Sequence, residues 1–303
     1  AIATMVGQAT MFVILLLMML ERDNLLALNF SEFKLDFSVC KKIAAISFPI
    51  FLGKFIFSFG KVSINSMCKA YGPLVVGALG VSNNVNGLAT NPINSFEEGT
   101  STIISQNLGA GNEKRALKTF RYSFFMATGL GIIGYILIRF ILQDEIIGLY
   151  NQNELAEGAA EFLQLIKSIH KYDSLSILAL AVNSAVLGVL YGYGKTKMTM
   201  ILNISRVFVF RIPILWYLQT FHKEIGAEAA GLSMGISNIC IAIASLACLG
   251  IFLWRIRSKK TEELKSSVGS FDLYTVFIYK NIITETVRTI RKPKLNAENN
   301  PTY

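Results

Sequence analysis

Five polar side chains that could bind a solute or an ion stand out in a largely apolar stretch of sequence, between Pro73 and Asn112. They are three amides and two carboxylates: Asn84, Asn91, Asn94, Glu97 and Glu98. Carboxylates bind protons or cations, and amides both donate and accept hydrogen bonds, so these groups could hold a solute together with an ion. The sequence contains no nucleophile motif or metal cluster that would make them catalytic. We therefore expect a binding site and not an enzyme.

These side chains must be positioned by one long helix. As a helix, residues 73–108 would extend for roughly 54 Å, whereas the hydrocarbon core of a bilayer is about 30 Å thick, so the polar groups must lie inside the membrane. At about 100° per residue, one face within about 60° of Asn91 gathers most of them, and Glu97 points away from that face. That face comprises Asn84, Gly87, Asn91, Asn94, Glu98, Thr102 and Ser105. A plainer interpretation is that the amides only bond neighbouring helices.

Pro92 lies in the middle of this helix and has no N–H for the carbonyl of Leu88. We therefore predict a kink or a loosened turn at mid-membrane, where free carbonyls could face a solute or a cation.

The composition indicates an all-α, polytopic membrane protein. The chain has 303 residues, of which 52% are hydrophobic and 16% are charged, and its mean hydropathy is +0.48. Such values exceed those of soluble domains. The net charge of +9 does not indicate a nucleic-acid partner, because the basic residues alternate between short loops instead of clustering on one face.

Apolar runs divide the chain into about seven expected spans. They cover 1–20, 43–68, 73–108, 119–141, 161–192, 198–219 and 229–254. We interpret 21–42 as a connector, 43–257 as a six-helix unit and 258–303 as a tail. Residues 271–292 of this tail suggest a basic amphipathic helix on the inner leaflet.

The distribution of basic residues predicts the orientation in the membrane. Most Lys and Arg residues lie in 21–42, 109–122, 193–198 and the segment after 254, whereas the opposite connections hold only Lys69, Arg139 and Lys223. Because basic residues collect on the cytoplasmic side, we expect a multi-pass protein of the cell membrane with a cytoplasmic C-terminus.

Several apparent motifs carry no function. Gly129 to Gly134 matches the dinucleotide pattern GxGxxG but lies within an apolar span, where small residues favour helix packing. Gly194-Lys195-Thr196 lacks the first glycine of a phosphate loop, since position 189 is Val189. His170 and His222 are isolated, and the four cysteines form no CxxC pair.

A series of short motifs between residues 41 and 257 resembles the second lobe of multidrug and toxic compound extrusion (MATE) transporters. Each motif is weak alone, but their order and spacing match the family. They are Ile46-Ser47-Phe48-Pro49, Asn65 before Tyr71-Gly72, Ser105 to Asn112 with Lys114-Arg115, Tyr191 to Thr196, Arg206 before Arg211-Ile212-Pro213, and Gly226 to Asn238.

The resemblance implies a twelve-helix, two-lobed antiporter that exports amphipathic, often cationic compounds in exchange for sodium or protons, with no other cofactor. Residues 1–20 would then be the last helix of a missing N-terminal lobe and 21–42 the inter-lobe linker. We expect such a fragment to be inactive alone. Some family members use an acidic residue in the seventh helix for a cation site, but 43–68 contains Lys54 and Lys61 and no carboxylate, so no metal ligands are assigned.

A structural turn is expected where the long helix ends. Gly109 and Gly111 allow the chain to adopt positive φ, before a basic cluster that stays in the cytoplasm. Gln106 and Asn107 belong to the same turn.

Lys54 and Glu98 are expected at similar depths, roughly 18 Å and 15 Å from the inner ends of adjacent antiparallel spans. If they pair, Glu98 holds helices together; if they do not, it carries a proton or cation, which we favour because it shares a face with Asn91 and Asn94.

Two other functions are weighed. A lipid-linked saccharide flippase of the related fold would have a basic cavity, which Lys54, Lys61, Arg206 and Arg211 could provide unless Lys61 snorkels outward and Arg206 reaches the inner interface. A membrane-embedded transferase would need an acidic metal cluster, which the sequence lacks.

Overall fold

The computed structural model describes residues 2–20, 36–150 and 158–269. Most of the expected linker at 21–42, the acidic loop at 151–157 and the expected amphipathic helix at 271–292 lie outside these ranges. The chain divides into residues 1–52 and a larger unit of residues 53–303. Each is described by itself.

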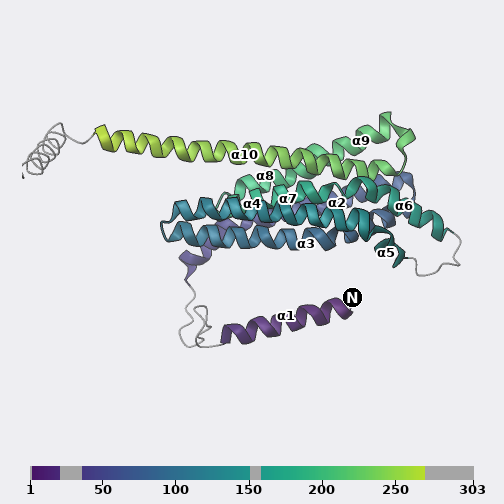
Figure 1. The fold of residues 1–303 in the computed structure, drawn as a ribbon, viewed down its shortest axis with the longest axis horizontal. Coiled ribbons are helices and arrows are strands. Elements are labelled where there is room, and N and C mark those ends of the chain that lie inside the picture. The colour runs from purple at the N-terminus through teal and green to yellow at the C-terminus, as the bar shows by residue number, and fades with distance from the viewer. Residues whose placement is uncertain (1, 21–35, 151–157, 270–303) are drawn as a thin grey trace, which may run out of the picture. The chain divides into compact units, whose positions relative to one another are not determined.

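All regular elements in the described ranges are helical (Figure 1). The first unit contains α1 (Ile2–Leu20) and the start of α2 (Phe37–Cys68). The larger unit contains the rest of α2 and the helices α3 (Pro73–Gly109), α4 (Glu113–Ile136), α5 (Gln143–Gly148), α6 (Ala159–Asp173), α7 (Ser176–Gly192), α8 (Thr196–Ser205), α9 (Ile212–Phe221) and α10 (Glu228–Gly269).

Among the described residues, four helical segments are long and apolar enough to cross a membrane, and a fifth is added if the bent pair α6–α7 forms one span. The four are Phe37–Tyr71, Glu113–Ile141, Thr196–Phe221 and Glu228–Ile256. Many large apolar side chains, such as Phe125 and Ile243, are exposed, as expected of helices that face lipid. The prediction of an all-helical, multi-pass membrane protein is therefore confirmed.

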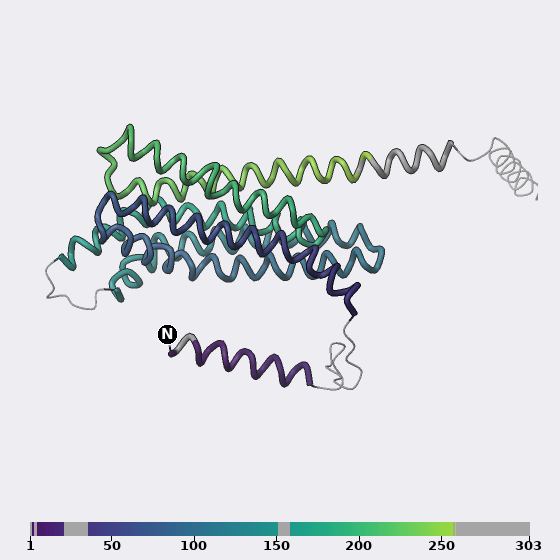
Figure 2. The backbone as a smooth tube through the Cα atoms, turned by 180° about the vertical axis from the view of Figure 1, so that it is seen from behind, coloured from purple at the N-terminus to yellow at the C-terminus, as the bar shows by residue number. Residues whose placement is uncertain are grey.

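The long polar helix forms as expected and lies at the centre of the larger unit. α3 packs against α4, α6 and α7, and it remains helical through Pro92. One face of α3 is buried among the neighbouring helices, including Leu79, Val85 and Ile93. Figures 1 and 2 show α3 and α4 as antiparallel neighbours joined by a short turn.

That turn has the hydrogen bonds of a Schellman motif. Asn112 N–H donates to the Asn107 carbonyl at 2.8 Å, and Gly111 N–H donates to the Leu108 carbonyl at 3.0 Å. Gly111 has φ of +73°, whereas Gly109 is the last helical residue and has no positive φ. The expectation of positive φ at both glycines is therefore wrong for Gly109, because this motif requires only one left-handed residue.

Glycines allow close contact between helices at two other points. A Cβ on Gly188 of α7 would lie 2.8 Å from the Glu97 carbonyl of α3, and one on Gly231 of α10 would lie 2.1 Å from the Ile169 carbonyl of α6. The glycine motif on α4 also packs closely, since a Cβ on Gly131 would lie 2.5 Å from the Ala181 Cβ. This agrees with the predicted packing role of the GxGxxG sequence.

The expected span at 161–192 is bent, because α6 and α7 meet at an angle of 43°. The break follows Asp173, where Ser174 Oγ donates to the Lys171 carbonyl at 3.2 Å and Ser176 Oγ donates to Asp173 Oδ1 at 3.2 Å. Serine and aspartate side chains compete for helical hydrogen bonds in this way and favour a break.

The expected span at 198–219 contains a π-helical segment, η4 (Arg206–Arg211), between α8 and α9. The Ile212 N–H donates to the carbonyl of Val207, five residues earlier. This π-turn determines where two arginines point.

Candidate functional site: connected polar cavities

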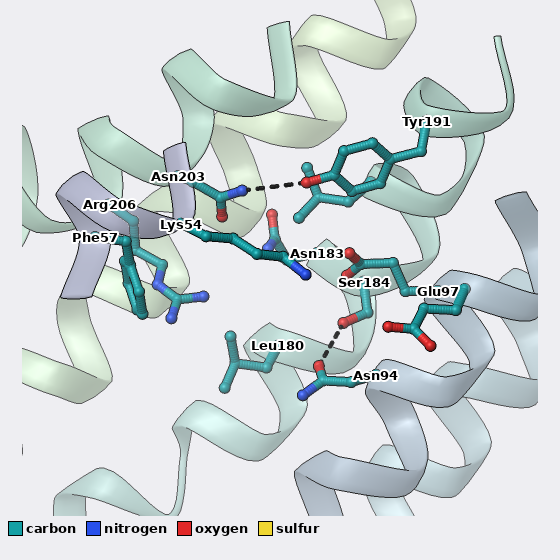
Figure 3. Close-up of a pocket in the computed structure, with 12 residues that line it drawn as sticks. Lys54, Phe57, Asn94, Glu97, Leu180, Asn183, Ser184, Tyr191, Asn203 and Arg206 are labelled. Atoms are coloured by element: carbon teal, nitrogen blue, oxygen red, sulfur yellow. Dashed lines mark hydrogen bonds between the residues drawn. The ribbon is translucent and has the colours of Figure 1, made fainter. Parts of the chain in front are cut away.

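Three polar cavities lie in the larger unit, beside α3. Cavity A has a volume of about 260 Å³ and is lined by residues from α2, α3, α7, α8 and η4 (Figure 3). Cavity B, of about 390 Å³, shares Phe57, Asn94, Leu180 and Arg206 with cavity A. Cavity C, of about 260 Å³, shares Lys61, Asn84 and Arg211 with cavity B. The shared side chains make the three cavities neighbours.

All six side chains that the sequence analysis proposed for binding lie at these cavities. Lys54, Asn94, Glu97 and Glu98 line cavity A, and Asn84, Asn91 and Asn94 line cavity B. The expectation that Glu97 points away is wrong. Glu97 lies one turn after Asn94, and side chains three residues apart on a helix are neighbours, so both reach the same cavity.

Lys54 and Glu98 line the same cavity, but they do not form an ion pair within 4.0 Å in the described part of the chain. Figure 3 shows the Lys54 ammonium extending into the space beside Asn183 and Ser184. The two charges therefore meet at a cavity, without direct contact.

Neutral polar groups from α7 and α8 complete cavity A. Ser184 Oγ donates to Asn94 Oδ1 at 3.3 Å, and Asn203 Nδ2 donates to the Tyr191 hydroxyl at 3.5 Å (Figure 3). Asn183 Oδ1 is buried without a hydrogen-bond partner among the described residues. These weak or missing bonds leave donors and acceptors available to a ligand.

Arg206 and Arg211 are brought to the same side by the π-turn. Residues five apart point about 140° away from each other on an α-helix, but the wider turn of η4 directs both arginines to cavity B. π-turns inside helices are frequently found at functional sites. The sequence analysis named these arginines only as possible lining of a basic flippase cavity and did not include them among the binding residues.

Arg206 lines cavities A and B and stacks on an aromatic ring. Its guanidinium lies over the Phe57 ring, with 4.3 Å from Cζ to the ring centroid, and its Nε is buried without a partner in the described ranges. Lys61 Nζ lies 5.0 Å from the centroid of the same ring. Arg211 is 4% exposed and donates to Ser237 Oγ at 3.0 Å and to Asn238 Oδ1 at 2.9 Å.

A separate group of polar side chains, which we call the buried network, connects α3 with the break between α6 and α7. Ser82 Oγ donates to Asp173 Oδ2 at 2.8 Å and lies 3.2 Å from His170 Nδ1. Asn86 Nδ2 donates to the Asp173 carbonyl at 3.2 Å. All four residues are buried. The sequence suggested that His170 is isolated, but in the structure it belongs to this network.

The buried network is not a catalytic triad. In a triad the histidine lies between the serine and the carboxylate, but here the Ser82 hydroxyl lies between His170 and Asp173 and is 0% exposed. The described residues also contain no group of three His, Cys, Asp or Glu side chains that could hold a metal ion.

The MatE family model matches residues 49–217. The chain belongs to the MATE family. The matched region includes every charged side chain of the three cavities, from Lys54 to Arg211.

Two relatives align with this MATE chain over similar lengths. The probable multidrug resistance protein NorM of Thermotoga maritima is 21% identical over 76% of this chain and 48% of the relative. The probable multidrug resistance protein YpnP of Bacillus subtilis is 21% identical over 73% of this chain and 47% of the relative. The chain thus spans about half the length of these relatives.

Solved structures share the fold of this MATE chain. A MATE protein in complex with MaL6 has a TM-score of 0.70 and 16% identity, over 78% of this chain and 52% of the other. A MOP superfamily transporter from Pyrococcus furiosus, described as having a binding pocket of reverse polarity, also has a TM-score of 0.70 and 16% identity, over 78% and 51%. The fold is therefore one MATE-type lobe with one preceding helix.

Proposed function

We propose that this MATE chain is one lobe of a secondary active antiporter, which exports amphipathic or cationic drugs and toxic compounds in exchange for sodium or protons. The observation that carries the proposal is the meeting of Glu98, Asn94 and Lys54 at cavity A within a bundle of spanning helices. A charge inside a membrane is costly unless it faces a partner or water, so such residues mark solute and ion pathways. The flippase alternative is not favoured, because these relatives are named multidrug resistance proteins.

Glu98 is the proposed coupling group. Its side chain is exposed at the cavity and forms no ion pair in the described ranges. A carboxylate in this position can exchange a proton or a sodium ion, while the amides of Asn91 and Asn94 bind the solute. Binding the ion and the solute in alternation would couple their movements.

The proposed transport requires a second lobe. Transporters of this type move solutes by rocking one lobe against the other around a central site, and this chain spans about half of its relatives. A lone lobe would expose its polar cavity to lipid. We expect residues 1–303 alone to confer no drug resistance and the two lobes together to confer it.

The proposed location is the cell membrane, with 109–122, 193–198 and the C-terminus in the cytoplasm, because these segments are rich in Lys and Arg. Cysteine labelling in intact cells tests this orientation, and strong labelling from outside at Lys114→Cys would refute it.

Dye efflux tests the function. Cells that lack their own exporters would express the natural reading frame containing this chain, with the sodium and the proton gradient collapsed in turn. Glu98→Gln should abolish efflux at unchanged expression, while Glu145→Gln, on the exposed helix α5, should leave it intact. If Glu98→Gln instead lost expression and Lys54→Met restored it, Glu98 would be a structural partner; normal efflux by Glu98→Gln would remove it from the mechanism.

A further inference from the structure

Three basic side chains converge on cavity B. Lys61 comes from α2, while Arg206 and Arg211 come from the two ends of the π-turn η4. Lys61 and Arg211 also line cavity C. The cations therefore lie between two neighbouring cavities.

Carboxylates offset the charge of this group only in part. Asp173 is the one carboxylate among the described lining residues of cavity B, and its two side-chain oxygens accept from Ser82 Oγ and Ser176 Oγ. Asp173 forms no ion pair within 4.0 Å in the described part of the chain. In cavity A, by contrast, Glu97 and Glu98 balance Lys54 and Arg206.

The donors of cavity B remain available for a ligand. Arg206 stacks one face on Phe57 and has a buried Nε without a partner in the described ranges. Stacking fixes the guanidinium plane while its edge stays free, and a planar fork of N–H donors suits carboxylate, sulfonate or phosphate groups. Three cations and one carboxylate line cavity B, and like charges repel one another, so a bound anion would stabilise this arrangement.

The surroundings of these cations also suit an amphipathic molecule. Phe57 and Leu180 provide apolar surface within cavity B, and Asn84 and Asn91 provide neutral hydrogen-bonding groups. A ligand with an acidic group and an apolar ring system would use both.

We propose that cavity B binds the acidic group of an amphipathic organic anion, held by Lys61, Arg206 and Arg211. This names a substrate class for the transporter described above and rests on that proposed function. The anion binds at cavity B, while the Glu98 carboxylate at cavity A is left for the coupling ion.

Binding to the purified 303-residue chain in a non-ionic detergent tests the inference. The probes are fluorescein and rhodamine 6G, which share a xanthene ring system but carry opposite charges, and fluorescence polarisation reports binding. Fluorescein should bind at least about tenfold more tightly than rhodamine 6G. Lys61→Gln and Arg206→Gln should each weaken fluorescein binding by about tenfold, and added salt should weaken it further.

Lys69→Gln is the matched control, because Lys69 is an exposed lysine outside the three cavities. It should leave fluorescein binding unchanged, and circular dichroism verifies that every variant is folded. Lys61 is itself exposed, so its substitution tests the site even if Arg206→Gln fails to fold. Equal or tighter binding of rhodamine 6G, or fluorescein binding that survives Lys61→Gln, would overturn the inference.

The outcomes for binding and transport are separable. Cells that export cationic dyes although the chain does not bind fluorescein would refute the anion site and leave the transport function standing. Fluorescein binding without any efflux would support the anion site and refute the transport function. Competition by phosphatidylglycerol but not phosphatidylcholine would support the anion site and identify a lipid phosphate as the bound group.

Discussion

Asp173 and Glu98 are both carboxylates in the helical lobe, but their environments are opposite. Asp173 is 2% exposed, and two serine hydroxyls donate to its side-chain oxygens. Glu98 is exposed to cavity A, and no side-chain hydrogen bond or ion pair of Glu98 is found in the described residues. The contrast separates a polar group that stabilises the fold from one that is free to bind a ligand.

The largest effect is expected from the buried network. Asp173→Ala leaves the Ser82 and Ser176 hydroxyls without their acceptor, and buried unsatisfied donors should lower the free energy of unfolding by about 3 kcal/mol. Asp173→Asn should cost less, since its amide oxygen still accepts one bond. Thermal unfolding in detergent measures both.

Glu98→Gln and Lys54→Met are the matched controls at the open cavity. Because both side chains are exposed, they should leave the unfolding midpoint nearly unchanged. A loss of unfolding stability in Glu98→Gln as large as that in Asp173→Ala would contradict the division between a structural and a binding carboxylate.

The next effect concerns the contact that holds α6, and with it Asp173, against α10. Gly231→Ala would place a Cβ 2.1 Å from the Ile169 carbonyl, so the helices must move apart at a cost of about 1–3 kcal/mol. Gly250→Ala on the same helix meets nothing within 4 Å and should be neutral or slightly stabilising. Equal unfolding midpoints for the two variants would show that this contact does not hold the network.

The sequence was sufficient to predict the helical class, the long polar helix and the side chains that line the cavities. These features follow from hydrophobic run lengths and from the 3.6-residue period, which placed Asn91, Asn94 and Glu98 on one face. The family motifs also predicted that these helices form one MATE-type lobe. Local rules were enough because each of these features lies within a single helix.

The sequence was insufficient wherever the local geometry departs from an ideal helix or depends on a distant partner. The π-turn directs Arg206 and Arg211 together, whereas α-helical spacing separates them. The buried network joins Ser82 to Asp173, which are 91 residues apart, so periodicity could not show it. The sequence signal for the break between α6 and α7 was the group of Asp173, Ser174 and Ser176.

The smallest effect is expected from an exposed ion pair between Asp144 of α5, which lies outside the spans, and Lys167 of α6. Asp144 Oδ1 lies 2.7 Å from Lys167 Nζ, and the Asp144 side chain is 76% exposed. The hydrogen bond and charge of Lys167 lower the pKa of Asp144. A depressed carboxylate pKa stabilises the fold above the unfolded value of about 4, and this contribution is lost as the pH falls through the folded value.

Water and salt weaken such an exposed pair. Asp144→Asn should therefore lower the unfolding midpoint only slightly at pH 7, and the difference from the unmodified chain should be smaller at about pH 3, because the contribution is lost as the pH falls towards and through the folded pKa of Asp144. Unfolding curves at both pH values, with and without 1 M salt, measure this. Inside the bundle, by contrast, removing one partner of an ion pair would leave an uncompensated charge and be strongly destabilising. A loss at pH 7 comparable to that of Asp173→Ala would therefore show that exposure does not distinguish structural carboxylates from the rest in this lobe.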